Sequence, residues 1–193
     1  MKRNEPFVSI MGIDPGLNAL GASIGWYYPR VKKLVIRDHT VVSSNTLARK
    51  DHRDEVKEYG SLISLFTCEE AMENLLTSWS PEFIVSEDAF YNPRMPNAFL
   101  SLKLCINAIQ RVLFRHEKAL YLIAPTIIKR TIFGSGTANK AAVHAGIVNH
   151  DDILCKDSKK KQLSKLVEHE ADSIAVCYTF TQLYLPDILL LKN

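Results

Sequence analysis

The sequence predicts an α/β fold in which a central five-stranded mixed sheet is flanked by helices. Two observations predict it. Short runs rich in β-branched and aromatic residues are typical of strands, and longer segments with apolar residues at three- and four-residue steps are typical of helices. A chain of 193 residues is long enough for one sizeable core, so we expect residues 1–193 to form a single domain.

The first predicted strand is an almost continuous apolar run, which is typical of a strand buried on both faces. The second and third runs are separated by the turn Pro29–Lys33, so the first three strands are expected to form an antiparallel meander. The five strands are predicted over Phe7–Ile13, Gly21–Tyr28, Leu34–Val42, Glu82–Glu87 and Ala119–Ile123.

Helical periodicity predicts a helix ending near Trp79 and four further helices over Asn97–His116, Pro125–Phe133, Ala138–Val148 and Leu163–Leu183. The helix Asn97–His116 is apolar on more than one face and therefore needs two partners. One is expected to be the sheet, and the second candidate is another subunit. We expect Asn45–Glu55 to be a loop and Asn149–Lys161 to be flexible.

The bulk composition is close to that of an average soluble globular protein, with 47% hydrophobic and 23% charged residues. No apolar stretch reaches the roughly 18 residues of a membrane span, and the polar start does not resemble a secretory signal, so a cytoplasmic location is expected. The four cysteines show no C-x-x-C spacing, which argues against a zinc ribbon or a disulfide framework. Reduced, mostly buried thiols are expected.

Basic residues gather in one part of the chain, although the net charge is only +3. Between Lys129 and Lys165 there are eight lysines and arginines against three aspartates. Such a cluster suits phosphate groups. The run Lys156–Lys165 has two interpretations, a DNA contact or a solvated loop without a partner.

Two acidic residues end predicted strands. Asp14 closes the first strand and is followed at once by Pro15 and Gly16, while Glu87 closes the fourth. Alternation directs Asp88 to the face opposite Glu87. If these two strands are neighbours, the two carboxylates lie side by side and favour a hard divalent cation such as Mg²⁺ or Mn²⁺. The alternative for each acid is a turn cap.

A third acidic locus opens the last predicted helix. His169 and Asp172 are three residues apart and are therefore neighbours on the helix surface, and Glu168 is a reserve candidate four residues before Asp172. Small residues at positions 171, 173 and 175 would let this helix approach the sheet closely and bring Asp172 to Asp14. The alternative is an exposed helix start whose acids interact with the helix dipole.

Four sequence blocks together resemble the RuvC-type Holliday junction resolvases. The blocks, in order, are Gly12–Gly16, Ile84–Phe90, Ile128–Lys140 and His169–Ala175. The resemblance runs from about Phe7 to Tyr178 and implies an RNase H-like fold, a homodimer and metal-dependent cutting of four-way DNA junctions. The compact form is similar to phage or viral members of the family.

The resemblance also implies roles for individual residues. Asp14, Glu87 and Asp172 would hold two Mg²⁺ ions, for which Mn²⁺ substitutes, with His169 as a fourth ligand or a proton handler. Lys129 and Lys140 match basic positions near the scissile phosphate, where Lys140 would neutralise developing charge, and Arg130 lies in the same block. Phe90 matches an aromatic residue that stacks on unpaired bases. Lys159, Lys160 and Lys161 have no counterpart and are expected to touch a DNA arm.

The predicted reaction is therefore hydrolysis of a phosphodiester in a DNA junction that leaves a 5′-phosphate and a 3′-hydroxyl. Three alternatives remain. One is a metal nuclease of the same fold that acts on RNA hybrids or other branched DNA, and another is a non-catalytic junction-binding protein. A kinase-like ATPase is the third, but the chain is too short for the two lobes that such a fold needs.

Overall fold

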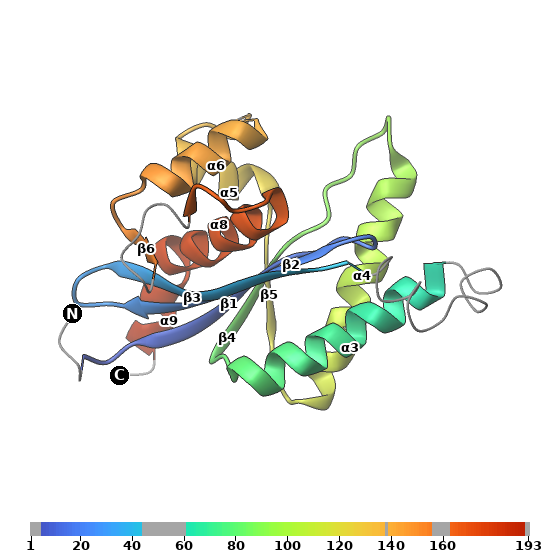
Figure 1. Cartoon of the computed structure of the whole chain (residues 1–193), viewed down its shortest axis with the longest axis horizontal. Helices are drawn as coiled ribbons and strands as arrows, with labels where there is room; N and C mark the ends of the chain where they lie inside the picture. The colour runs from blue at the N-terminus through green and yellow to red at the C-terminus, as the bar shows by residue number, and fades with distance from the viewer. Residues whose placement is uncertain (1–4, 44–60, 138, 156–162, 192–193) are drawn as a thin grey trace.

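The computed structural model describes residues 5–43, 61–137, 139–155 and 163–191, and these residues build one mixed sheet with helices on both faces (Figure 1). The strands lie in the order β5-β4-β1-β2-β3-β6. Their bounds are β1 Val8–Asp14, β2 Leu20–Tyr28, β3 Lys33–Val42, β4 Phe83–Glu87, β5 Leu120–Ile123 and β6 Ile153–Cys155. The first three form the predicted antiparallel meander, and β4 and β5 run parallel to β1.

The sheet has six strands within the described residues, so the predicted number of five is wrong. The sixth, β6, lies inside the segment Asn149–Lys161 that was expected to be flexible, and it pairs in parallel with Leu34–Ile36. The residue just before β6 is fixed by an ion pair, because Nζ of Lys33 lies 2.7 Å from Oδ1 of Asp152. A strand of three residues is too short to show an alternating pattern, and its pairing depends on β3, which is distant in the sequence.

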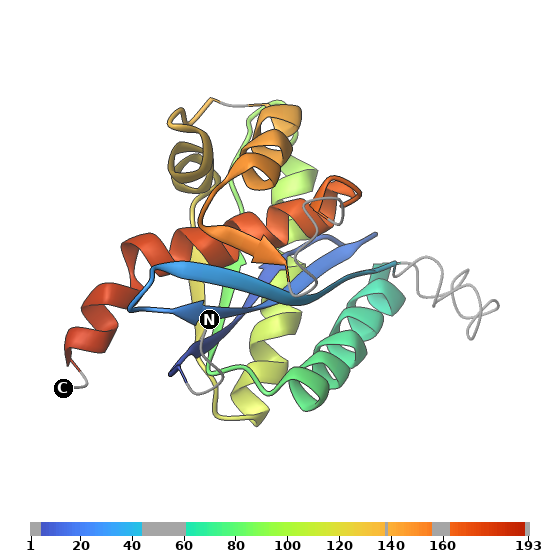
Figure 2. The same ribbon diagram turned by 60° about the vertical axis from the view of Figure 1, so that its left-hand side comes forward.

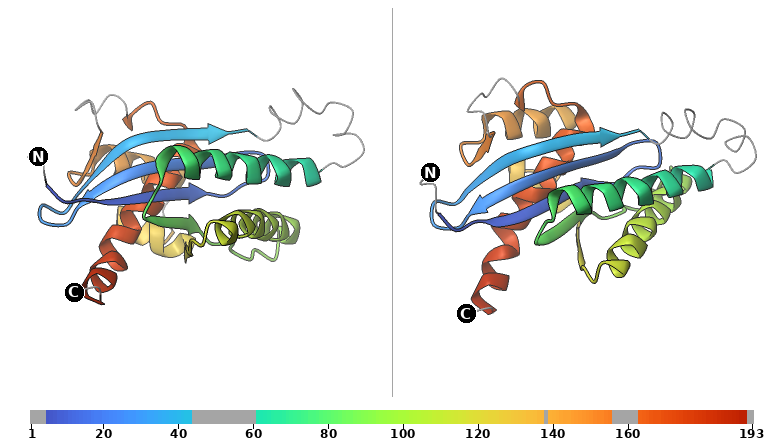
Figure 3. Two further views of the ribbon diagram at one scale, coloured as in Figure 1. Left: turned by 90° about the horizontal axis from the view of Figure 1, so that it is seen from below. Right: turned by 60° about the horizontal axis from the view of Figure 1, so that its bottom comes forward.

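The helices divide between the two faces of the sheet, as the views in Figures 1, 2 and 3 agree. One face carries α3 Ser61–Trp79 and α4 Pro96–Arg115. The other carries α5 Pro125–Phe133, α6 Lys140–Asn149 and α8 Glu168–Leu183, and α9 Leu185–Leu191 follows α8. The predicted helices at these positions are confirmed, apart from the start of α8 and the additional helix α9. The loop predicted over Asn45–Glu55 lies outside the described residues.

The start of α8 is Glu168, five residues later than predicted, because the backbone N–H of Val167 donates to the carboxylate of Glu170 and caps the helix there. Helix α9 was missed because the prediction ended the last helix at Leu183. Within the described residues, no single helix is long and apolar enough to cross a membrane; α8 and α9 reach that length and composition only together, with a bend of 47° between them.

Strand β1 is buried on both faces, as its apolar run predicts. Ile10 packs in the core under α5, α6 and α8, whereas Met11 and Ile13 pack in the core under α3 and α4. All three side chains are fully buried. Because alternate residues enter different cores, β1 is the layer on which both sets of helices pack.

Helix α8 approaches β1 and β2 so closely that only glycine fits beneath it. A Cβ atom on Gly12 would lie 2.2 Å from the backbone oxygen of Ser173, and one on Gly21 would lie 2.2 Å from the backbone oxygen of His169. Ser173 is fully buried at this contact, so the predicted close approach of this helix to the sheet is confirmed, whereas Ala171 lines a second pocket with Ala141 and His144 of α6. The first turn of α8 is thereby fixed beside the end of β1.

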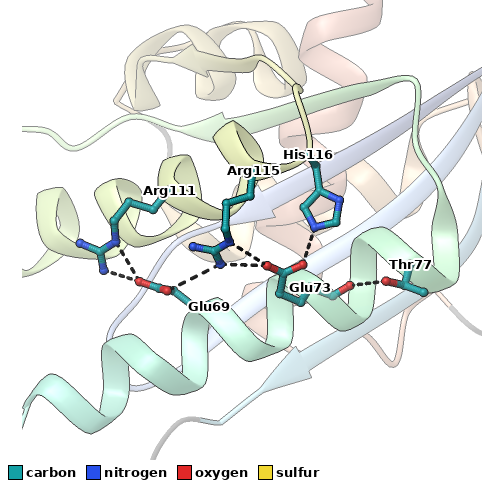
Figure 4. Close-up of polar contacts among 6 residues, drawn as sticks. All are labelled: Glu69, Glu73, Thr77, Arg111, Arg115 and His116. Atoms are coloured by element: carbon teal, nitrogen blue, oxygen red, sulfur yellow. Dashed lines mark hydrogen bonds and ion pairs between the residues drawn. The ribbon is translucent and has the colours of Figure 1, made fainter.

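Helices α3 and α4 are joined along their exposed edge by ion pairs (Figure 4). Arg111 pairs with Glu69, and Arg115 Nη2 lies 2.8 Å from Oε1 of Glu73. His116 also contacts Glu73, and the hydrogen bonds from Arg115 and His116 lower the pKa of that carboxyl. The inner face of α4 therefore has the sheet and α3 as its two partners, while Leu100, Leu104 and Phe114 form a stripe that remains exposed.

Candidate active site

A cavity of about 240 Å³ opens at the edge of the sheet where β1 and β4 end. Its walls come from β1, β4, the loop after β4, and helices α4, α5, α6 and α8. Every side chain proposed above as a ligand, together with two of the proposed DNA contacts, lines it: Asp14, Glu87, Phe90, Lys129, His169 and Asp172. Residues that are up to 158 positions apart are thus brought to one place.

Asp14 and Glu87 reach the cavity because β1 and β4 are parallel neighbours. Ile13 is in register with Ser86, so the next residue of each strand is the acid that ends it. Ser86 is fully buried, and only 13% of the Asp14 side chain is exposed. The prediction that these two strands lie side by side is confirmed.

Asp88 also lines this cavity, which contradicts the prediction that it points to the opposite face from Glu87. Strand β4 ends at Glu87, so the alternation of side chains stops there and the chain turns. The backbone N–H of Asp88 donates to the carbonyl of Ile123, and its Oδ1 atom lies 2.8 Å from Nζ of Lys103. The cavity therefore holds an additional carboxylate that is neutralised by α4.

His169 contacts Asp14 directly. Its Nδ1 atom lies 2.6 Å from Oδ2 of Asp14 and donates a hydrogen bond to that carboxylate. This bond and the charge of Asp14 raise the pKa of His169 above its ordinary value; burial opposes the shift, and Glu168 and Asp172 add to it. The imidazole thus carries a proton more readily here than in water and offsets part of the negative charge of the cavity.

The first turn of α8 is anchored by a pair that the sequence analysis did not select. Oε1 of Glu170 lies 2.9 Å from Nδ1 of His39 on β3, and Oε2 accepts the backbone N–H of Val167 at 3.0 Å. The usual sequence signal for such a capping box is Ser or Thr three residues before Glu. Val167 occupies that position, so the signal is absent, and the link to His39 depends on tertiary structure.

The basic residues divide into three groups. Lys129, on α5, lines the cavity. Arg130 lies beside it on the same helix but is not one of the residues that line the cavity wall. Lys140 begins α6, but its side chain lies outside the described residues, as do Lys159, Lys160 and Lys161.

The donor set suits a divalent metal ion by its chemistry. Asp14, Glu87, Glu168 and Asp172 offer carboxylate oxygens and His169 offers an imidazole, and carboxylate oxygens are the ligands that Mg²⁺ and Mn²⁺ prefer. Among the residues that the structure describes, no three His, Cys, Asp or Glu side chains converge closely enough to hold an ion as they stand. Nδ1 of His169 and Oδ2 of Asp14 contact each other in this arrangement.

The chain was compared with known protein families. The family model described as "Crossover junction endodeoxyribonuclease RuvC" matches residues 10–180. The chain belongs to this family. The prediction that it is a crossover junction endodeoxyribonuclease is thereby confirmed at the level of the family, and enzymes of this family use divalent metal ions.

Curated relatives of the RuvC family match over most of their length. The crossover junction endodeoxyribonuclease RuvC of Orientia tsutsugamushi (strain Ikeda) is 28% identical over 170 residues, covering 88% of this chain and 92% of the relative. That of Rickettsia typhi is 26% identical over 178 residues, covering 88% and 94%. The family match over residues 10–180 includes every residue that lines the cavity.

Solved structures of resolvases share the fold. RuvC from Thermus thermophilus in complex with a Holliday junction substrate has a TM-score of 0.64 at 18% identity, covering 89% of this chain and 92% of that one. The yeast mitochondrial Holliday junction resolvase Ydc2 has a TM-score of 0.65 at 14% identity, covering 92% and 79%. The predicted RNase H-like α/β fold is confirmed.

We predict that Asp14→Asn lowers the pKa of His169 in the metal-free protein, because the neutral amide no longer stabilises the imidazolium. The pair stabilises the folded state below about pH 6.5, the ordinary histidine pKa, and this stabilisation is lost as the pH rises through the raised pKa. A proton NMR titration of the histidine ring signals in the presence of a chelator measures the shift. His116 and His150 serve as internal references, and an unchanged His169 titration would show that Asp14 does not stabilise the charged ring.

Proposed function

We propose that this chain, as a single nuclease domain in the cytoplasm, resolves four-way DNA junctions by metal-dependent phosphodiester hydrolysis. One observation carries the proposal: in a member of the RuvC family, the acids at the ends of β1 and β4, the first turn of α8, Phe90 and Lys129 all line one cavity. Acidic, aromatic and basic side chains at one place suit a metal site, an unpaired base and a phosphate respectively.

In this proposal Asp14, Glu87 and Asp172 hold two Mg²⁺ ions, which Mn²⁺ can replace, and His169 is either a fourth ligand or a proton handler. A bound pair of such ions supplies an activated water and stabilises the leaving 3′-oxygen. As a ligand His169 would complete the donor set, and as a proton handler it would hold or move a proton at its Nδ1 atom, which contacts Asp14. The products carry a 5′-phosphate and a 3′-hydroxyl.

The DNA contacts are assigned to both sides of the cavity. Phe90 lines the cavity and is 61% exposed. Exposure of an aromatic ring to water is unfavourable, and stacking on an unpaired base would cover the ring. Lys129 contacts the phosphate beside the acids, and Arg130 follows it on α5. Lys140, at the start of α6, neutralises the charge that develops during cleavage. Lys159, Lys160 and Lys161 extend the contact along a DNA arm.

Asp14→Asn is expected to lower the rate of junction cleavage by at least about a hundredfold, the cost of removing one preorganised electrostatic contact from an active site. Junction affinity should be unchanged, because basic residues supply it. Cleavage with Mg²⁺ is measured on a panel of junction, flap, RNA–DNA hybrid and plain duplex, with exposed Asp187→Asn as the matched control. Cutting at the wild-type rate would refute the role of Asp14, and preferred cutting of another substrate would assign that substrate instead.

Phe90→Ala is expected to slow junction cleavage about tenfold, since stacking on a base contributes roughly 1–3 kcal/mol. Tyr91→Ala is the control, because Tyr91 is similarly exposed on the same loop but packs edge-on against Phe99. Single-turnover rates on a junction containing 2-aminopurine report both cleavage and stacking. Equal effects of the two substitutions would remove Phe90 from the base contact.

The proposal includes a homodimer formed through the helix predicted over Asn97–His116, which is α4. Leu100, Leu104 and Phe114 lie on one side of α4, opposite its buried face, and all three are exposed. Two symmetric cuts in a junction require two active sites, and a two-fold dimer supplies them. The exposed stripe supports self-association through the outer face of α4. The inner face of α4 already packs on the sheet and on α3.

Leu100→Glu is therefore expected to convert a dimer into a monomer at micromolar concentration, because two facing carboxylates repel and an apolar contact is lost. Light scattering after size exclusion gives the mass. Val31→Glu, which places the same charge on the exposed turn between β2 and β3, is the control and should leave the dimer intact. A wild-type monomer with full resolving activity would contradict the dimer.

A further inference from the structure

Two cysteine thiols face each other between helices α3 and α4, which cover one face of the sheet. Cys68 lies on α3 and Cys105 on α4, and their Sγ atoms are 3.6 Å apart. Cys68 is 3% exposed and Cys105 is fully buried. The two cysteines are 37 positions apart, which hides this pairing from any search for closely spaced cysteines.

The second neighbour of Cys105 is the loop that follows Asp14. The backbone N–H of Gly16 donates a hydrogen bond to the Cys105 sulfur, and the charge of Asp14 acts on the same atom. Cys105 therefore lies between a second thiol and the Asp14–Pro15–Gly16 turn, which carries the central acid of the cavity. A movement of its sulfur toward Cys68 removes a hydrogen bond from that turn.

Ion pairs join α3 and α4, the two helices that carry these thiols, along their exposed edge (Figure 4). Glu69 is the residue next to Cys68, and it pairs with Arg111 one and a half turns after Cys105. Glu73, one turn further along α3, pairs with Arg115 and His116. These contacts lie on the same pair of helices as the two sulfur atoms and are consistent with the close approach of α3 and α4 there.

We propose that Cys68 and Cys105 are a reversible oxidation site, which forms an intramolecular disulfide with a peroxide and slows cleavage by loosening the Asp14–Pro15–Gly16 turn. The sulfur atoms need to approach from 3.6 Å to about 2.05 Å. That shift draws Cys105 away from the Gly16 N–H. The effect on cleavage rests on the proposed nuclease function, whereas formation of the disulfide does not.

The oxidation proceeds in two steps that balance. The Cys105 thiolate attacks one oxygen of hydrogen peroxide, the O–O bond breaks, and Cys105 becomes a sulfenic acid while the departing hydroxide takes up a proton to form water. The Cys68 sulfur then attacks the Cys105 sulfur, forming the S–S bond and releasing a second water that includes the Cys68 proton. Two thiols lose two electrons in all, and peroxide gains them.

The direction of attack agrees with the surroundings of the two thiols. The hydrogen bonds donated by Cys68 and Gly16 lower the pKa of Cys105, while the shared hydrogen bond and burial raise the pKa of Cys68. Cys105 therefore ionises more readily than Cys68, which makes Cys105 the attacking thiol and Cys68 the resolving thiol. Cys177 is different, because burial raises its pKa to about 12, and it faces Ser23 rather than a second thiol.

The test treats the folded, full-length protein with hydrogen peroxide, blocks remaining thiols with an alkylating reagent under denaturing conditions, and maps the peptides by mass spectrometry. We expect a linked pair of peptides containing Cys68 and Cys105 that has lost two hydrogen atoms, and dithiothreitol should restore both thiols. Half-exposed Cys155 is the internal reference for oxidant dose. If that dose oxidises Cys155 while Cys68 and Cys105 remain alkylatable, the proposed oxidation site does not exist.

The coupling to the turn is measured on the same oxidised sample. Hydrogen exchange of the Gly16 amide should be faster after oxidation, and junction cleavage should be at least about fivefold slower. Cys68→Ala should keep the cleavage rate of the reduced protein and lose both responses to peroxide. A disulfide that leaves Gly16 exchange and cleavage unchanged would overturn the coupling. A reduced protein that cuts no substrate would refute the nuclease function, and the exchange measurement would then still decide the coupling.

Discussion

The site depends on how closely α8 lies against β1 and β2. The absence of side chains at Gly12 and Gly21 lets the backbone of Ser173 and His169 occupy the space where Cβ atoms would be. This contact places an imidazole on Asp14, although the two residues are 155 positions apart. Close packing leaves little freedom for the first turn of α8, and the bonds of Glu170 to Val167 and His39 remove more of it. The geometry of the cavity is therefore set largely by backbone packing.

Much of the fold could be predicted because its signals are local. The continuous apolar run of β1 predicts burial on both faces, and the spacing of His169 and Asp172 predicts that they share a helix face. Features that depend on distant partners were missed. The three residues of β6 acquire their role only beside β3, and Asp88 turns into the cavity because β4 ends one residue earlier. The cap residue three positions before Glu170 is not Ser or Thr, so the sequence gives no signal for the capping box. The other partner of Glu170, His39, lies on strand β3.

The acidic side chains of the cavity and those of the surface have different kinds of partners. Inside, His169 faces Asp14, whose carboxylate raises the pKa of the imidazole, and Lys103 pairs with Asp88. On the α3 and α4 edge, Glu69 and Glu73 have permanent partners in Arg111 and Arg115. Exposed pairs of this kind contribute little free energy but define register. The first arrangement is suited to exchange of partners, and the second to keeping two helices in a fixed relation.

The short strand β6 has a consequence for the edge of the sheet. A free β-strand edge is a template on which another chain can add a strand. Here β6 occupies only the Leu34–Ile36 part of the ten-residue strand β3, and a register shift at Ile24 and Gly25 adds twist where that cover ends. Beyond it, Asp38 and His39 place polar groups along the remaining edge, and His39 is already held by Glu170. Among the described residues, these features make the β3 edge a poor template for strand addition.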